Sequence, residues 1–346
     1  KKLNMSLKNL SVKIKIPKVL KNKLKNRKIS QIYKKFAKSI SINENFIVAV
    51  SGGPDSLALA FLSKIYSIQK NLKVKFYIID HKLRAESTNE AKYVKKILNK
   101  FQINTEILYW QGIKPTSNIQ SIARTKRLEL LISKCKKLGI THILLGHHQE
   151  DLIENFFIRI LRGSGLKGLI SLSKKTKLQN VTILRPLINL KKDDLVFISK
   201  KVFDFYVEDP TNNDEKFQRA RIRKLLKGLK NDGLDRKKFI KTIENLKKSN
   251  DVVNYYVTKN LENNSFFSNK KKHLILNDEF FKQPHEIVFR SLSDSLNFVS
   301  KKYYSVRGKK IDKIIKDIQK SSFSRSTLGS CLIEKVNQTV IISKEQ

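Results

Sequence analysis

Between residues 46 and 188, strand-like and helix-like patterns of hydrophobic residues alternate along the chain. Short runs rich in β-branched and aromatic residues are each followed by a longer segment whose apolar residues recur at helical spacing. The predicted strands lie at residues 46–50, 73–80, 104–110, 141–146 and 181–188, and the predicted helices at residues 55–69, 87–101, 117–138 and 149–161. Strands that alternate with helices predict an α/β fold, in which an open parallel sheet is covered by helices.

A different pattern begins after the polar segment Tyr206–Asp214, which we interpret as a loop. Lysine-rich stretches with helical spacing follow at residues 217–230 and 236–261. Near the end of the chain, alternating apolar and polar residues flank the pair Asn337 and Gln338, which is typical of a β-hairpin. The second part of the chain is therefore predicted to be a basic α-helical region with a C-terminal β-hairpin.

These patterns predict three parts: a basic extension at residues 1–30, an α/β domain at residues 31–215 and a basic helical region at residues 216–346. The first thirty residues hold many lysines and no acidic residue. They lack the apolar run and the small-residue cleavage site of a secretory signal. A basic arm, a disordered extension and an organelle-targeting segment all remain open as interpretations of this stretch.

The net charge of the chain indicates what kind of partner it binds. The chain has 72 Lys and Arg against 30 Asp and Glu, a formal net charge of +42. Such an excess favours a polyanion, above all nucleic acid, although the abundant lysine could also reflect an AT-rich genome. No apolar run is long enough to span a bilayer, so we predict no membrane association. The two cysteines, Cys135 and Cys331, form no C-x-x-C motif, which argues against a thiolate metal site and a disulfide framework.

The segment "SGGPDS", Ser51 to Ser56, joins the first predicted strand to its helix. Its two glycines allow positive φ and close backbone approach, so that successive N–H groups can converge on an anion at the positive end of the helix. The segment has no lysine and is too short for a Walker A loop. The alternative is a plain Gly-Gly turn, with Pro54 in the first helical turn and Asp55 complementing the helix dipole.

Two more polar clusters follow strand ends, where ligands of open α/β sheets bind. Asp80 and His81 end the second strand, in position for the ribose or base of a nucleotide, and Arg84 follows within reach of its phosphates. The third cluster starts at Gly146 and His147. Adjacent histidines point in different directions, so His147 and His148 do not predict a zinc pair.

Carboxylates follow the two histidines. Glu150 or Asp151 and Glu154 lie three to four residues apart and share one face of a helix. Oxygen ligands so placed can hold Mg²⁺ on a triphosphate, or an ammonium group, or they can merely complement the helix dipole. Arg124 and Arg127 also share a helical face, where they could be solvated or bind an anion. Together, the clusters predict a nucleotide site without a Walker lysine.

The segment "SGGPDS" resembles the pyrophosphate loop of the N-type ATP pyrophosphatases, also called the PP-loop superfamily. With "DHKLRAES", "GHHQEDLIENFFIRILRGSG", "RPLI", "EDPTN" and "RARIR", the chain resembles the tRNA(Ile)-lysidine synthetase family from about Phe46 to Leu226. The resemblance implies a Rossmann-like, adenine nucleotide alpha hydrolase-like fold. It also implies a bacterial-type ligase of the cytoplasm, with an organelle of bacterial descent as the alternative location. Such a ligase uses ATP and Mg²⁺ to join L-lysine to C2 of the wobble cytidine of the CAU-anticodon isoleucine tRNA.

The residues and the resemblance together give the predicted site. The catalytic candidates are Asp55, Asp151 and Glu154, and the Mg²⁺ candidates are Glu150 and Asp151. The ATP-binding candidates are Ser51, Gly52, Gly53, Pro54, Asp55, Ser56, Asp80, His81, Gly146 and His147. The candidates for the substrate lysine or tRNA are Arg84, Arg124, Arg127, Arg162, Glu208, Arg219 and Arg223.

The chain departs from the family pattern at four positions. Glu150 stands where paired aspartates are usual, Leu128 replaces a tyrosine, Gln120 a frequent glutamate and Ala220 a frequent asparagine. These departures affect the substrate contacts rather than the nucleotide site. Three alternatives remain: a PP-loop tRNA thiolase, a small-molecule synthetase and a non-catalytic basic RNA-binding protein. The oligomeric state is also open, with a homodimer among the choices.

Overall fold

The computed structural model describes residues 16–117, 119–178, 180–208, 214–301, 306–320 and 322–345. The chain divides into two compact units, Lys1–Leu234 and Asp235–Gln346. The boundary predicted at residue 215 stays a prediction, and the first fifteen residues of the predicted basic extension lie outside the described residues.

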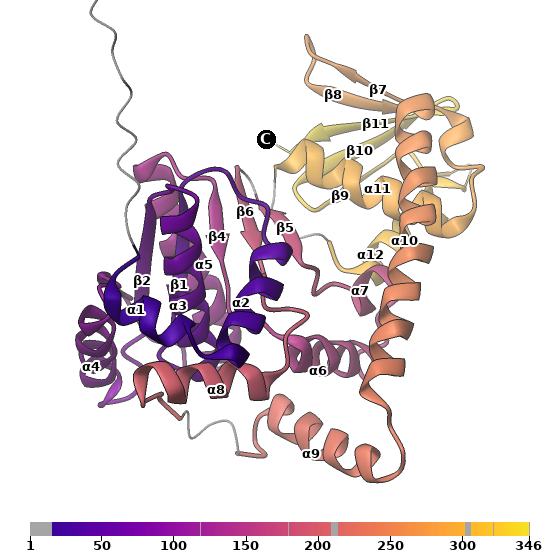
Figure 1. Cartoon of the computed structure of the whole chain (residues 1–346). Coiled ribbons are helices and arrows are strands. Elements are labelled where there is room, and N and C mark those ends of the chain that lie inside the picture. Colours follow the sequence, from indigo (N-terminus) through magenta and orange to yellow (C-terminus); the bar gives the residue numbers. More distant parts are fainter. Residues whose placement is uncertain are drawn as a thin grey trace, which may run out of the picture. The chain divides into compact units, whose positions relative to one another are not determined.

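The first unit contains the elements that the hydrophobic pattern predicted, together with further helices and one edge strand that it did not predict. In chain order they are α1 (Lys18–Leu24), α2 (Arg27–Ser39), β1 (Phe46–Val50), α3 (Pro54–Gln69), β2 (Val74–Asp80), α4 (Ser87–Lys100), β3 (Thr105–Tyr109), α5 (Ile119–Leu138), β4 (His142–Leu144), α6 (Gln149–Ile160), α7 (Leu166–Leu169), β5 (Lys175–Leu178), β6 (Val181–Leu184), α8 (Lys192–Phe203) and α9 (Gln218–Asn231). The predicted α/β fold is confirmed (Figure 1).

The sheet of the first unit has the strand order β3-β2-β1-β4-β6-β5. The neighbouring pairs from β3 to β6 are parallel, while β5 runs antiparallel to β6. The strand order reverses at β1, since β2 lies on one side of β1 and β4 on the other. In an open α/β sheet, ligands bind in the crevice at such a reversal, beyond the carboxyl ends of the strands.

The central strand β1 is buried on both faces. Phe46, Val48 and Val50 pack in a core cluster with residues of α3, α4 and α8, and Ile47 and Ala49 pack in a second cluster with residues of α5. A strand covered on both sides reads as a continuous apolar run, which is why "FIVAV" shows no polar alternation. The helices α1 and α2 add Leu20, Ile29 and Phe36 to the first cluster.

The second unit combines helices with an antiparallel sheet. Its elements are α10 (Arg236–Asn264), β7 (Ser265–Ser268), β8 (His273–Leu276), η2 (Asp278–Phe280), α11 (His285–Ser300), α12 (Gly308–Ile318), β9 (Arg325–Leu328), β10 (Cys331–Val336) and β11 (Thr339–Lys344). The predicted hairpin is confirmed as β10 and β11, in which Val336 pairs with Thr339 across the turn. It belongs to a five-stranded sheet of order β7-β8-β11-β10-β9, whose other strands the sequence analysis missed.

None of the helices in the described ranges is long and apolar enough to cross a membrane.

Candidate active site at the carboxyl edge of the sheet

The segment from Ser51 to Ser56 forms the connection between β1 and α3. Gly52 has φ +86°, a left-handed conformation that favours glycine. The backbone N–H of Ser51 donates to Ser56 Oγ at 3.0 Å, and Ser56 Oγ donates to the carbonyl of Gly53 at 2.9 Å. These bonds fold the segment back on itself over the start of α3.

The start of α3 lacks a side-chain cap. Gly53 is the N-cap residue and has no side chain to offer, and Pro54 occupies the first helical turn. Since the first N–H groups of a helix have no partner within the helix, they face whatever lies beyond the end of β1. The segment is thus a turn and, at the same time, an arrangement suited to an anion.

Replacing Gly52 with alanine is expected to weaken ATP binding about tenfold or more. The new Cβ would lie 2.7 Å from Val94 Cγ2 and 3.0 Å from Val207 Cγ2, at a φ that L residues rarely adopt, so the loop backbone must shift. Equilibrium dialysis with labelled ATP measures the effect. The matched control is Gly228→Ala, because nothing lies within 4 Å of a Cβ at that helical position. Equal affinities for both variants would contradict the role of the loop.

The connection between β4 and α6 lies directly against this loop. A Cβ on Gly146 would lie 3.3 Å from the carbonyl carbon of Asp55 and from the nitrogen of Ser56. Only a residue without a side chain allows the two backbones to approach this closely without displacement. The ends of β1 and β4 therefore form one continuous site.

His148 holds the carboxylates of this site together. It is buried and is the N-cap residue of α6. Its Nε2 lies 3.4 Å from Asp55 Oδ2 and 3.4 Å from Asp151 Oδ2, and its Nδ1 lies 3.0 Å from Glu150 Oε2. The ring therefore joins the first turn of α3 to the first turn of α6.

The charge of His148 follows from these contacts. Burial alone lowers the pKa of His148, but the carboxylates of Asp55, Glu150 and Asp151 outweigh burial and raise it to about 10. The three carboxylates thus favour the protonated form of the ring. This role was not evident from the sequence, and the signal that could have revealed it is the acidic "QED" segment directly after the histidine.

Among the described residues, no group of three or more His, Cys, Asp and Glu side chains is placed to hold a metal ion. Mg²⁺ on a nucleotide needs fewer protein ligands, since one or two carboxylates, the phosphates and water complete its shell. Asp55 and Asp151 fit this mode, because their carboxylates approach the same ring from the first turns of α3 and α6, and Asp55 Oδ1 is buried without a hydrogen-bond partner among the described residues. Glu150 Oε2 lies 3.0 Å from His148 Nδ1 and accepts from the N–H of Lys192.

Two arginines of α9 pair with the carboxylates of α6. Arg223 donates from Nε to Glu154 Oε1 at 2.6 Å and from Nη2 to Glu154 Oε2 at 3.2 Å, and Glu154 is buried. Arg219 Nη1 lies 3.9 Å from Asp151 Oδ1. The two acids lie three residues apart on α6, and the two arginines lie four residues apart on α9. Residues at either spacing share one face of a helix, so the two helices meet along one charged face. Glu154, predicted as a catalytic candidate, thus has both carboxylate oxygens in an ion pair.

A cationic group lies next to the carboxylates. Burial, together with Arg124 and Arg219, lowers the pKa of Arg127 to about 10, so the guanidinium keeps its charge at neutral pH. Burial and the arginines Arg185, Arg124, Arg127 and Arg219 lower the pKa of His147 well below its usual value. Burial and Arg127 lower the pKa of His81 to about 4. Both histidines are therefore neutral beside several positive charges.

Three predicted site residues have contacts that involve other parts of the unit, and a fourth, Glu208, is exposed. Asp80 accepts from Lys82 N–H, Ser87 Oγ and Thr88 Oγ1 and so fixes the turn into α4. Arg84 pairs with Glu90 at 2.9 Å, and Arg162 donates to Gln218 Oε1 at 2.8 Å. Glu208 is exposed and precedes residues 209–213, where the rest of the "EDPTN" motif lies outside the described residues.

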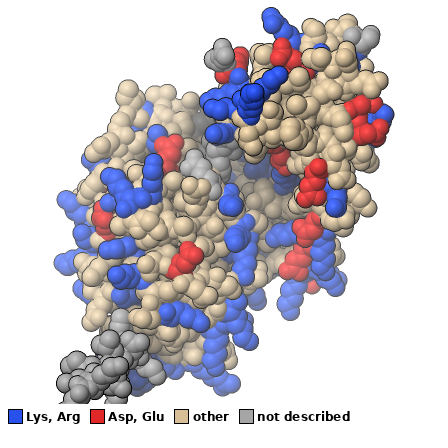
Figure 2. Space-filling view, turned by 90° about the horizontal axis from the view of Figure 1, so that it is seen from above, with Lys and Arg blue, Asp and Glu red and all other residues tan. Residues whose placement is uncertain are grey.

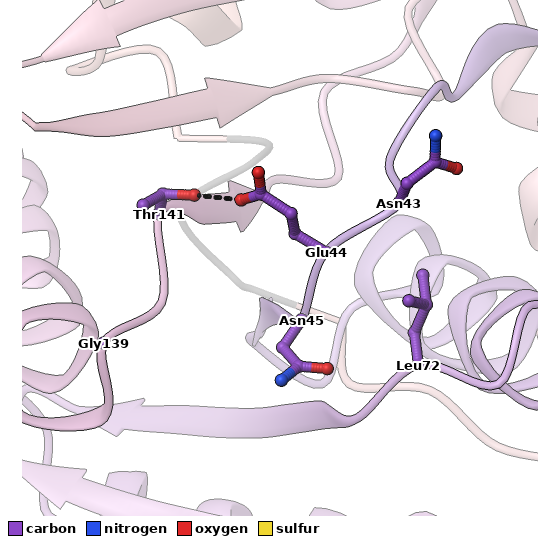
Figure 3. Close-up of a pocket in the computed structure, with 6 residues that line it drawn as sticks. All are labelled: Asn43, Glu44, Asn45, Leu72, Gly139 and Thr141. Atoms are coloured by element: carbon purple, nitrogen blue, oxygen red, sulfur yellow. Dashed lines mark hydrogen bonds between the residues drawn. The ribbon is translucent and has the colours of Figure 1, made fainter.

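A separate pocket of about 340 Å³ lies at the opposite edge of the sheet (Figure 3). Its lining residues precede β1, β2 and β4 in the chain: Asn43, Glu44, Asn45, Leu72, Gly139 and Thr141. Thr141 Oγ1 donates to Glu44 Oε2 at 2.8 Å, and Asn45 Oδ1 accepts from the N–H of Lys73. These side chains serve the local turns and add nothing to the site at the carboxyl edge.

The surface of the protein is strongly basic. Figure 2 shows Lys and Arg over much of the visible face and far fewer Asp and Glu. A polyanion is the partner that such a surface favours, with an affinity that falls as salt rises.

Known proteins resemble this chain in sequence. Residues 21–229 match the family model of the PP-loop domain. A tRNA(Ile)-lysidine synthase of Wolbachia sp. subsp. Brugia malayi is 32% identical over 311 residues, which cover 88% of this chain and 71% of the relative. A second one, from Orientia tsutsugamushi, is 42% identical over 187 residues, which cover 54% of this chain and 42% of the relative, so that the chain spans less than half the length of this relative.

Among solved structures, a U34-tRNA thiolase from Methanococcus maripaludis with its 4Fe-4S cluster superposes with a TM-score of 0.55 at 17% identity. The superposition covers 64% of this chain and 78% of that chain, and at this identity it supports the fold alone. By the PP-loop domain and by its similarity over most of its length to the Wolbachia relative, this chain belongs to the tRNA(Ile)-lysidine synthase family of PP-loop proteins.

Proposed function

We propose that the protein is a carbon–nitrogen ligase, a tRNA(Ile)-lysidine synthase. ATP activates the C2 oxygen of the wobble cytidine in the isoleucine tRNA with a CAU anticodon, and the ε-amine of L-lysine then displaces AMP. The overall reaction converts ATP to AMP and pyrophosphate and changes decoding from AUG to AUA. The names of the relatives support this assignment.

One observation about the site carries the proposal. Four side chains at the carboxyl edge each have a buried polar atom without a hydrogen-bond partner among the described residues: Asp55 Oδ1, His81 Nδ1, Arg127 Nε and His147 Nδ1. Buried polar atoms are normally satisfied, so a cluster of unsatisfied ones favours a ligand that completes them. A nucleoside triphosphate offers anionic oxygens and a heterocyclic base, which these side chains can bind.

The loop from Ser51 to Ser56 is proposed to bind the phosphates and to stabilise the departing pyrophosphate. Its N–H groups and the helix end behind it are fixed before the reaction, so they stabilise developing charge without reorganisation. Asp55 would hold Mg²⁺, which neutralises part of the charge on the triphosphate when it is bound with ATP. The metal ligand thus lies in the loop that binds the same phosphates, and Asp151 stays available for proton transfer.

The substrate lysine must lose a proton from its ammonium group before it attacks. Asp151 is the better candidate for the base, since both oxygens of Glu154 already accept from Arg223. Arg219 would bind the carboxylate of lysine, and Arg124 and Arg127 the phosphates of ATP or tRNA, for which a guanidinium is suited. Because the substrate is a tRNA, we propose that the reaction takes place in the cytoplasm.

A thiolase is the second candidate, since it shares the fold. The two cysteines of this chain argue against it, because both are buried and lie in different compact units. Burial also raises the pKa of Cys135 to about 11, which disfavours the reactive thiolate. We therefore retain the ligase assignment.

The decisive test is mass analysis of a CAU-anticodon isoleucine tRNA transcript after incubation with the protein, ATP, Mg²⁺ and lysine. The expected result is a mass gain of one lysine less one water, because the C2 oxygen leaves with AMP, and this gain disappears when ATP is omitted. Release of pyrophosphate, measured with and without lysine and tRNA, separates the ligase from a protein that only binds RNA. A transcript of unchanged mass, with protein that still binds ATP, would refute the proposal.

A further inference from the structure

Aromatic and basic side chains gather where β2 and β3 end. Asp80 pairs in register with Tyr109, so the residues that follow them leave the sheet side by side. Lys82 Nζ lies 5.1 Å from the centroid of the Tyr109 ring. Lys114 Nζ lies 4.1 Å from the centroid of the Trp110 ring and donates to the carbonyl of Trp110 at 3.0 Å. We call Lys82, Tyr109, Trp110 and Lys114 the β3-end cluster.

Trp110 and Lys114 connect the β3-end cluster to the proposed ATP site, while Tyr109 and Lys82 lie on the other face of the strand end, because successive side chains of a strand alternate in direction. The His81 ring packs edge-on against Trp110, with 5.9 Å between ring centroids. His81 is also close enough to Arg127 for this guanidinium to lower its pKa. Trp110, Arg127 and the unpartnered Nδ1 of His81 therefore belong to one connected part of the edge.

The two aromatic rings differ in exposure. Trp110 is 4% exposed and serves as a buried wall, whereas Tyr109 is 39% exposed, with a lysine beside its ring. An exposed aromatic ring next to cations is the arrangement on which unpaired nucleobases stack while the cations meet the phosphates. Paired bases in a duplex offer no free face, so the fitting ligand is a loop or another single-stranded segment.

We propose that the β3-end cluster is a stacking site for an unpaired nucleotide that neighbours the target nucleotide in the RNA substrate. Tyr109 supplies the stacking face, and Lys82, which lies beside the same ring, meets the adjoining phosphate. The inference rests on the proposed function in one respect, since it takes the RNA to be a tRNA whose anticodon loop enters this edge. The basic character of the chain supplies the charge complementarity that such an occupant requires.

The chain itself provides a reporter for the test. Trp110 is the single tryptophan of the sequence, so intrinsic tryptophan fluorescence comes from this cluster alone. The full chain is titrated with a CAU-anticodon stem-loop, and the change in fluorescence gives the dissociation constant. The same titration with a fully paired RNA hairpin of equal length and a minimal turn measures binding that does not need unpaired bases.

Tyr109→Ala is expected to weaken stem-loop binding about tenfold, within the range found when a stacked aromatic is removed. Tyr109→Phe is expected to bind like the unmodified protein, because stacking needs the ring and not the hydroxyl. The matched control is Tyr93→Ala, which removes an exposed tyrosine of α4 that packs against Phe205. This control is expected to leave the dissociation constant unchanged.

Two results would overturn the inference: equal stem-loop affinity of Tyr109→Ala and the unmodified protein, or an equal loss of affinity for the paired hairpin. The proposed function fails separately. If Tyr109-dependent stem-loop binding is found but lysine is never transferred, the stacking site stands and the ligase assignment falls. If Tyr109→Ala transfers lysine at the normal rate and binds the stem-loop with the normal affinity, the ligase assignment stands and the stacking site falls.

Discussion

Asp55→Ala abolishes ATP-dependent modification, with an expected loss of at least about a hundredfold in rate, the scale found when one preorganised polar group is removed from an active site. Asp55 stands in the first turn of α3, in the loop that is proposed to hold the phosphates, and its Oδ2 lies 3.4 Å from His148 Nε2. Its Oδ1 is buried without a partner among the described residues, which leaves that oxygen for a ligand.

The measurement is the rate of lysine incorporation into the transcript, together with a filter-binding assay for tRNA affinity. Binding of tRNA is expected to persist, because phosphate contacts are spread over many basic side chains. Asp193→Ala is the matched control, since Asp193 is an exposed acid in the first turn of α8 and has no place in the site. Lysidine formation at the unmodified rate by Asp55→Ala would remove the loop from the mechanism.

Arg223→Ala lowers the free energy of unfolding by about 2–4 kcal/mol, since it leaves the buried carboxylate of Glu154 without its partner. Arg223 is partly exposed, with 28% of its side chain accessible. The expected loss of stability is therefore no larger than the loss found when a fully buried ion pair is broken. The pKa of Arg223 points the same way: burial lowers it, but the pairing with Glu154 outweighs burial and raises it.

Urea denaturation measures this loss, and two further variants test its cause. Lys227→Ala changes an exposed residue one turn along α9 and is expected to cost less than about 0.5 kcal/mol. Replacing Glu154 and Arg223 together with leucine is expected to recover much of the loss, since apolar residues of similar volume often substitute for buried ion pairs. A double variant less stable than Arg223→Ala would show that the pair does more than neutralise Glu154.

Where the sequence carried strong periodic signals, it predicted the fold well. The run "FIVAV" and the glycine-rich segment after it located β1, the turn and the start of α3 almost to the residue. The strand β5 was missed because "KTKL" alternates lysine and threonine with a single apolar residue, which is how an exposed edge strand looks. The helices α1 and α2 were missed because their lysines hide an apolar face of few residues.

The candidate site was harder to predict because its contacts join distant parts of the chain. The sequence placed Asp55 and Asp151 at neighbouring strand ends, but nothing local indicates that the ring of His148 lies between them. The partner of Glu154 lies on α9, and only tertiary packing brings Arg223 to it. For Asp80 the sequence suggested a ribose contact, but in the structure its carboxylate accepts from the hydroxyls of Ser87 and Thr88 in the turn before α4.

The pairing of α6 with α9 has a practical consequence for dissecting the molecule. A fragment that stops at residue 215 would keep every strand of the first sheet but would lose Arg219 and Arg223. The buried carboxylate of Glu154 would then lack its arginine partner. Such a fragment should be soluble only in part and should bind ATP poorly. The shortest autonomous piece of this protein should therefore run through Leu234, where the first compact unit ends.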